Sequence, residues 1–266
     1  MKEKILEILK ENRDSFVSGQ EISNKLGITR AAVWKHIKRL ENDGYKIESM
    51  SKNGYKLVYC PDVLTYEEIK DTLKSKIIGQ RIVHFDTLGS TSEKARELAE
   101  CGEKEGTIII AEEQSDGRGR IGRKWFSQNR LGIWMSVILR PGIRMNEVPL
   151  VTGLACEAVA ASIRKFAENV EIKWPNDIFL NGKKLCGILT QASGETDMVD
   201  YVIVGIGINV NETIDDFPDE IKDKATSIML ETGKVASRKQ LLCSVISEFD
   251  GLYCKFKNTL PLNREQ

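Results

Sequence analysis

A segment in which glycine and arginine alternate carries the clearest chemistry in this sequence. It reads GRGRIGRKW and spans residues 117–125. Glycine lets the backbone bend tightly and leaves amide N–H groups bare, while guanidinium groups grip phosphates and carboxylates through paired hydrogen bonds. Like charges repel and glycine is entropically costly to order, so we expect this arginine loop to be mobile without a ligand. It lacks the Gly-Lys-Ser/Thr ending of a Walker loop. Taken alone, it is equally typical of an anion-binding loop and of an RG-rich segment that binds RNA or is disordered.

Three further segments place polar or small residues at strand ends. KWPND at 173–177 sets Asn and Asp after a stiffening proline, and KLCGIL at 184–189 opens an apolar strand with a lysine. GIGINVN at 205–211 puts small residues in a buried strand, where a ligand or another backbone can approach closely. Each of the three also has a purely structural explanation: a turn, a lysine lying along the apolar surface, or tight packing.

The composition is that of a soluble globular protein with about two domains. The chain has 266 residues, 41% hydrophobic, and its 39 Lys and Arg balance 39 Asp and Glu, which excludes a uniformly basic coat for nucleic acid. The longest apolar stretch, around 202–208, is far shorter than the ~20 residues that span a bilayer, and the start has no secretory pattern. Six cysteines without a CxxC pair indicate reduced thiols and a cytoplasmic protein. Because the apolar stretches are short, we expect no membrane contact. Only two histidines are present, which argues against a His/Cys metal site.

Charge is distributed unevenly along the chain. Residues 1–60 carry 12 Lys and Arg against 8 Asp and Glu, whereas residues 61–266 carry 27 against 31. Cys60-Pro61-Asp62 interrupts the hydrophobic periodicity at the same place. We therefore predict two domains, residues 1–60 and 61–266.

The first domain has the pattern of a winged helix-turn-helix. A short helix ends at Gly27, Thr29 can cap the next helix over 30–40, and an Asn-Gly turn joins two strands within 45–58 as the wing. The alternative is a small helical packing module whose cations are merely solvated. The outer face of the second helix has no acidic residue before Glu41, which favours DNA binding. The predicted DNA-binding residues are Thr29, Arg30, Trp34, Lys35 and Lys38.

From residue 61 onward, strands and helices mix. The pattern predicts strands at 81–86, 107–111, 132–139 and 201–209, a hairpin at 178–185, and helices at 65–74, 92–99, 148–166 and 237–257. This order predicts an α+β fold with a mainly antiparallel sheet backed by helices.

Together, the four motifs and the first domain resemble the bifunctional biotin protein ligases that also act as biotin operon repressors. The resemblance covers nearly the whole chain, and the arginine loop combined with KWPND is highly specific. It implies a catalytic domain similar to the class II aminoacyl-tRNA synthetases. It also implies an ATP-dependent, AMP-forming ligase that makes biotinyl-5'-AMP and transfers biotin to a lysine of the biotin carboxyl carrier protein or domain of acetyl-CoA carboxylase.

The resemblance also implies roles for individual residues. Those matching biotin-binding positions are Ser90, Thr91, Ser92, Gln114, Arg118, Gly119, Arg120 and Lys184. Those matching ATP-binding positions are Arg123, Trp125, Lys173, Asn176 and Asn209. Asp177 matches a Mg²⁺ position, and Arg118, Arg120 and Lys184 are the expected catalytic residues.

Elementary electrostatics agrees with that chemistry. Biotin's carboxylate must approach the anionic α-phosphate of ATP, and two unit charges 4 Å apart repel by about 4 kcal/mol at an intermediate dielectric. Arginines, Lys184 and Mg²⁺ can offset this repulsion, and a closed loop keeps water from the mixed anhydride. We expect no covalent enzyme intermediate, because the named residues position and neutralise rather than attack. The family further implies that the adenylate-bound homodimer binds operator DNA and represses genes of biotin synthesis and uptake.

Two departures from the family pattern matter. Gln191 stands where the family usually has Glu, and the small C-terminal β domain of the family is not found before residue 266. A DNA-binding biotin sensor with weak or no ligase turnover is therefore an alternative, and a ligase for lipoate or another short acid is a third reading.

Overall fold

The computed structural model describes residues 1–51, 53–195 and 197–260, and its contacts divide the chain into two compact units. The first unit is Met1–Asp62 and the second begins at Val63, close to the predicted boundary after residue 60. Residues 261–266 of the predicted second domain lie outside the described part.

The first unit consists of three helices followed by a hairpin. The helices are α1 (Lys2–Glu11), α2 (Gly19–Leu26) and α3 (Arg30–Asn42), and the antiparallel strands are β1 (Lys46–Met50) and β2 (Gly54–Tyr59). Their core includes Ile5, Leu9, Ile22, Val33, Ile37, Leu40 and Leu57.

Local signals fix the helix ends of this unit. Ser18 and Thr29 accept hydrogen bonds from the first-turn amides of α2 and α3, and Gly27 ends α2 in the left-handed conformation. Gly54 has φ +105°, and a Cβ there would lie 2.1 Å from the Val17 carbonyl oxygen, so only glycine fits at the wing turn. The winged helix-turn-helix prediction is confirmed at this level.

Seven strands form one sheet in the described part of the second unit, in the order β3-β4-β5-β9-β8-β7-β6. Only β3 and β4 pair in parallel, and the other neighbours are antiparallel. The α+β prediction with a mainly antiparallel sheet is therefore confirmed. The strands are β3 (Ile82–Leu88), β4 (Ile108–Gln114), β5 (Ile133–Leu139), β6 (Val170–Lys173), β7 (Asp177–Leu180), β8 (Lys183–Ser193) and β9 (Tyr201–Ile208).

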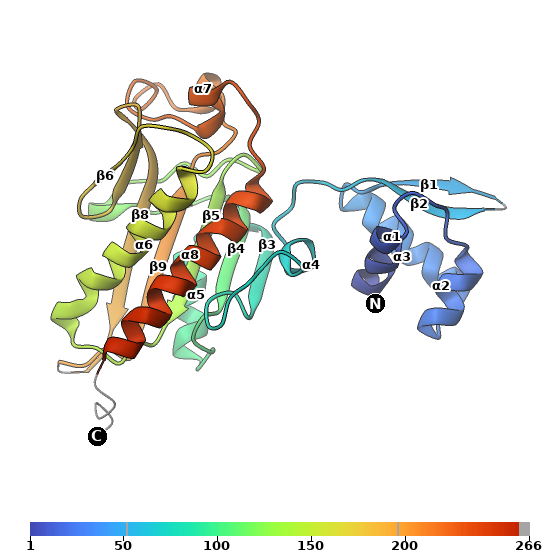
Figure 1. The fold of residues 1–266 in the computed structure, drawn as a ribbon, viewed down its shortest axis with the longest axis horizontal. Helices are drawn as coiled ribbons and strands as arrows, with labels where there is room; N and C mark the ends of the chain where they lie inside the picture. The colour runs from blue at the N-terminus through green and yellow to red at the C-terminus, as the bar shows by residue number, and fades with distance from the viewer. Residues whose placement is uncertain (52, 196, 261–266) are drawn as a thin grey trace. The chain divides into compact units, whose positions relative to one another are not determined.

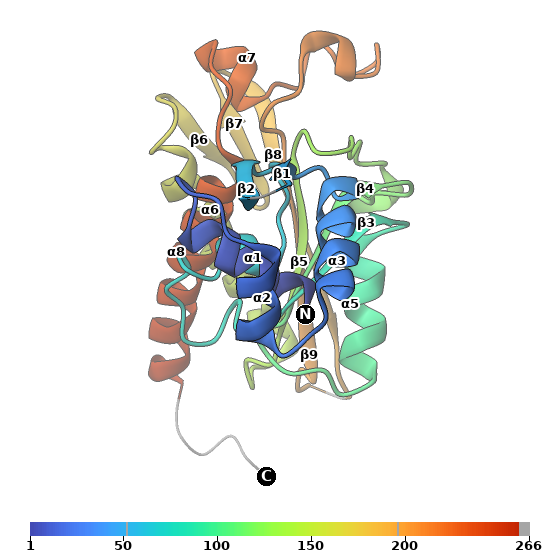
Figure 2. The same ribbon diagram turned by 90° about the vertical axis from the view of Figure 1, so that its right-hand side faces the viewer.

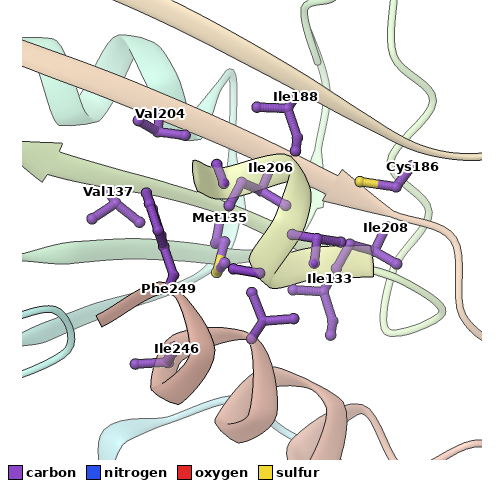
Figure 3. Packing of buried hydrophobic residues seen from close by; sticks show 14 of the residues in the cluster. Ile133, Met135, Val137, Cys186, Ile188, Val204, Ile206, Ile208, Ile246 and Phe249 are labelled. Carbon is purple, nitrogen blue, oxygen red and sulfur yellow. The ribbon is translucent and has the colours of Figure 1, made fainter. Parts of the chain in front are cut away.

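Helices cover both faces of this sheet, so the unit has three layers (Figures 1 and 2). Helices α6 (Val148–Ile163) and α8 (Arg238–Thr259) pack side by side on one face, and α5 (Thr91–Glu100) covers the other. Figure 3 shows Ile246 and Phe249 of α8 in the same apolar cluster as side chains of β5 and β9, such as Val137 and Val204. The described part also holds two short α-helices, α4 (Tyr66–Ile69), which ends earlier than predicted, and α7 (Ile228–Thr232). Three single-turn 3-10 helices are formed by Arg120–Gly122, Met145–Glu147 and Ile214–Asp216.

A buried ion pair ties α8 to the sheet. Glu112 of β4 and Arg238 at the start of α8 are completely buried, and their oxygen and nitrogen atoms are 2.8 Å apart. Glu112 also accepts a hydrogen bond from the backbone amide of Leu64 and lies 2.9 Å from the His84 ring nitrogen. Burial alone would raise the pKa of Glu112, but His84, the Arg238 charge and the Leu64 amide hold it at about 2. The charge is therefore fully paired, as a buried charge must be.

Candidate functional site

A cavity of about 480 Å³ lies in the second unit, where β4 and β9 end and β8 begins. The first turn of α5, the arginine loop and the glycines of β8 and β9 line it. Of the residues predicted for biotin, ATP or metal, those lining the cavity are Ser90, Thr91, Ser92, Gln114, Arg118, Gly119, Arg120, Arg123, Trp125, Asn176, Asp177, Lys184 and Asn209.

Lys173 is the predicted ATP-binding residue that does not line the cavity. It lies on edge strand β6, and its ammonium group is 3.9 Å from the centroid of the Phe179 ring. Its ring contact places it beside β7. Its contact with the nucleotide stays a prediction.

Hydroxyl and amide side chains form the polar floor of the cavity. The Thr91 amide donates to Gln114 Oε1 at 2.8 Å, and Gln114 Nε2 donates to Ser127 Oγ at 2.8 Å. Ser136 of β5 lies between Thr91 and Ser92, with oxygen–oxygen distances of 2.9 and 3.0 Å. Of these residues, Thr91, Ser92 and Gln114 line the cavity and can hydrogen-bond a compact polar ring at its inner end.

The indole of Trp125 lies flat in a slot made by two glycines. A Cβ at Gly187 would lie 2.9 Å from the indole ring, and one at Gly207 would lie 2.5 Å from its Nε1. Trp134 contacts the same indole edge-on at 6.4 Å between ring centroids. The Trp125 Nε1 is buried and has no hydrogen-bond partner among the described residues, so an N–H donor is available there.

The arginine loop folds back on itself over the cavity. The Gly119 amide donates to the Arg123 carbonyl at 2.7 Å. Arg118 Nη1 donates to Glu93 at 2.6 Å, and Arg120 Nη1 donates to Asn176 Oδ1 at 2.7 Å, so the loop is bound to both α5 and the KWPND segment. Its mobility without a ligand stays a prediction.

Lys184 is paired with the predicted metal ligand. Its Nζ is 2.8 Å from Asp177 Oδ1 and 5.5 Å from the centroid of the Trp125 ring. Asn176 Nδ2 donates to the same carboxylate oxygen at 3.0 Å. The described residues contain no cluster of three His, Cys, Asp or Glu side chains that could hold a metal by themselves. Mg²⁺ is commonly bound by one or two carboxylates together with substrate phosphates, and Asp177 fits that arrangement.

Sequence reasoning missed one side of the cavity. The segment after β9 contributes Phe217, Ile221, Lys224 and Ala225. A parallel bridge between Lys184 and Ala225 holds this segment against β8. No local motif marks it, because the contact joins residues about 40 positions apart.

The predicted DNA-binding residues lie on α3 and at its start. Arg30, Trp34, Lys35 and Lys38 are exposed, Trp34 by 55%. Thr29 is exposed too, and its side-chain oxygen caps α3 by accepting from the Ala32 amide at 3.2 Å. This face is therefore open to a ligand in the first unit.

Comparison with known proteins agrees with these two units. Residues 2–56 match the family described as "HTH domain", and residues 88–209 match the "Biotin/lipoate A/B protein ligase family". The "Bifunctional ligase/repressor BirA" of Bacillus spizizenii is 44% identical over 254 residues, covering 95% of this chain and 78% of that protein. The Escherichia coli protein of the same name is 34% identical over 73% of this chain and 60% of its own length.

The solved structures give the same result for the second unit. A biotin protein ligase from Aquifex aeolicus, in complex with biotin and ATP, is 37% identical, covers 68% of this chain and 73% of its own, and has a TM-score of 0.57. Fold and cavity thus define a protein of the biotin/lipoate ligase class with an added helix-turn-helix unit. Within that class, the chain belongs to the family of bifunctional biotin ligase/repressors.

None of the helices in the described ranges is both long and apolar enough to cross a bilayer.

Proposed function

We propose that this chain activates biotin with ATP to biotinyl-5'-AMP and transfers the biotin to a lysine of a biotin carboxyl carrier protein or domain. The observation that carries the proposal is the cavity itself. A polar floor lies at one end of a space of about 480 Å³, with a stacking indole beside it. The cations that line this space include Arg118, Arg120, Arg123 and Lys184. Such a space suits a ring, a carboxylate and a nucleotide bound side by side.

Charge neutralisation is the main catalytic contribution of this site. Lys184 and the arginines of the loop offset the repulsion between biotin's carboxylate and the α-phosphate, and they stabilise the charge that develops as the two react. The ion pair with Asp177 holds the Lys184 ammonium group at the cavity wall. When biotin binds, its carboxylate replaces Asp177 as the partner of this lysine. Mg²⁺ bound through Asp177 would supply further neutralisation of the phosphates.

Transfer follows from the same geometry. Pyrophosphate leaves in the first step, and an acceptor lysine then attacks the mixed anhydride and releases AMP. Neither step forms a covalent bond between the substrate and a side chain of this protein. The loop, already attached to Asn176 through Arg120, keeps water away from the anhydride while it waits for the acceptor.

The repressor activity is assigned to the first unit. We infer that the adenylate-bound chain forms a homodimer in the cytoplasm and binds a two-fold operator through the exposed face of α3. Two half-sites add phosphate contacts that one small unit cannot supply at cellular salt.

The decisive experiment measures pyrophosphate release from ATP with and without biotin, followed by transfer of labelled biotin to a purified carrier domain. We expect biotin-dependent release by the wild-type chain. Lys184→Met should reduce that rate about a hundredfold, because it removes a positive charge that stabilises the developing negative charge. Its neighbour Lys183, which does not line the cavity, provides the matched control Lys183→Met, expected to remain active. Absence of biotin-dependent release by the wild-type chain contradicts the proposed function.

A further inference from the structure

Ser136 lies beneath the cavity without touching it. It is on β5, completely buried, and absent from the cavity lining. Its oxygen is 2.9 Å from Thr91 Oγ1 and 3.0 Å from Ser92 Oγ, both in the first turn of α5. Thr91 and Ser92 do line the cavity, so Ser136 reaches a ligand only through them.

The direction of each hydrogen bond in this cluster can be worked out from one group that cannot accept. The backbone amide of Thr91 is a donor only, and its partner at 2.8 Å is therefore the oxygen of the Gln114 side chain. This fixes the Gln114 amide, with Nε2 donating to Ser127 Oγ at 2.8 Å. Ser127 in turn donates to the Trp125 carbonyl at 3.4 Å.

The donor and acceptor roles of the Thr91, Ser136 and Ser92 hydroxyls follow from the same starting point. Thr91 Oγ1 donates its single proton to Gln114 Oε1 at 3.1 Å, so it must accept from Ser136. Because Ser136 donates its single hydroxyl proton to Thr91, it must accept a hydrogen bond from Ser92. Ser92 consequently faces the cavity with lone pairs only. Its oxygen would lie 2.5 Å from a Cβ at Gly205, so it is held against the bare backbone of β9.

We propose that Ser136 is a positioning residue that fixes Ser92 as a hydrogen-bond acceptor and thereby selects a ring that brings N–H donors. A cyclic urea carries two such donors, whereas a dithiolane ring carries none. The inference rests on the proposed function, since biotin has a cyclic urea, and it goes beyond that function by assigning ring selection to a residue outside the cavity.

The test compares biotin kinetics of Ser136→Ala with those of the wild-type chain. Without Ser136 the Ser92 proton is free to turn toward the cavity and oppose an incoming N–H. The KM for biotin should rise about tenfold, equivalent to about 1.4 kcal/mol, while kcat and the KM for ATP stay within about twofold. Desthiobiotin, which keeps the urea ring, should lose the same factor. Ser136→Cys keeps a weak S–H donor, so its KM for biotin should lie between those of the wild-type chain and of Ser136→Ala.

A matched control is available in Ser162, which is equally buried. Its hydroxyl donates to the Ala158 carbonyl at 2.8 Å and accepts from Ser244 at 3.1 Å, but it lies on α6 and does not line the cavity. Ser162→Ala should leave the biotin KM unchanged. A Ser92→Ala variant provides the second arm: its loss should be similar to that of Ser136→Ala, and the double variant should lose no more than either.

The outcomes separate the two proposals. Active wild-type enzyme with an unchanged biotin KM in Ser136→Ala overturns the inference and leaves the proposed function standing. Additive losses in the double variant, or equal changes in kcat and both KM values, also overturn it. A wild-type chain without biotin-dependent pyrophosphate release overturns the proposed function, and this inference with it.

Discussion

Glu212 is a buried carboxyl group whose titration should be visible in the stability of the protein. It follows β9, is 2% exposed, and neither of its oxygens has a hydrogen-bond partner in the described residues. Burial raises its pKa to about 7. The backbone amides of Glu212 and Val210 oppose the shift, Asp216 adds to it, and the Arg238 charge opposes it.

The sign and size of the effect follow from linkage. An unfolded glutamate titrates at 4.5, so the folded chain holds the Glu212 proton more tightly. The resulting stabilisation is complete below pH 4.5 and is lost as the pH rises through about 7. A shift of this size corresponds to about 3 kcal/mol. The glutamine side chain in Glu212→Gln is neutral at every pH, so this variant does not lose stability as the pH rises through about 7. We therefore expect its free energy of unfolding, relative to wild type, to rise by about 2–3 kcal/mol between pH 5 and pH 8.

The assay is urea unfolding followed by tryptophan fluorescence in a Trp34→Phe background. The remaining tryptophans, Trp125, Trp134 and Trp174, all belong to the second unit, so the signal reports that unit alone. Glu220→Gln, an exposed carboxyl of the same segment, is the control and should show no such trend. A stability difference for Glu212→Gln that stays flat from pH 5 to pH 8 would refute the assignment of this titration to Glu212.

Three further changes probe the cavity and the DNA-binding face. Gly207→Ala places a methyl group against the Trp125 indole, so we expect a loss of about 1–3 kcal/mol in urea unfolding and a higher KM for ATP, with the unobstructed Gly251→Ala as control. Arg120→Gly should release biotinyl-AMP from the site, measured as labelling of bystander proteins; an intermediate that stays tightly held would contradict loop closure. Arg30→Ala should weaken operator binding about tenfold in a gel-shift assay at fixed salt and leave pyrophosphate release intact, and loss of both activities would argue against independent units.

Elements with local signals were predictable from the sequence. The helix-turn-helix unit is one case, because the caps at Ser18 and Thr29 and the left-handed Gly27 act within a few residues. The hairpin joining β7 and β8 is another, since Asn181 and Gly182 both adopt positive φ at its turn. The motif residues were also predictable as a group, and nearly all of them line one cavity. Their individual roles stay predictions.

Features that depend on distant contacts were not predictable. Strand β6 and helix α7 are short and have no strong periodicity, and the parallel pairing of β3 with β4 joins segments separated by α5. Ser136 has an ordinary apolar strand around it, so only the fold reveals that its hydroxyl meets α5. Lys173 was assigned by its motif, and it lies on edge strand β6 outside the cavity lining, so its nucleotide contact stays a prediction.

The hydrogen bond between Leu64 and Glu112 bears on how such a protein can be assembled from parts. Leu64 comes just after the division between the two units, yet its anchor belongs wholly to the second. A graft or excision at Asp62–Val63 would leave this fastening intact. Exchange of the helix-turn-helix unit for another at this point would therefore keep the hydrogen bond that holds the start of the second unit to β4.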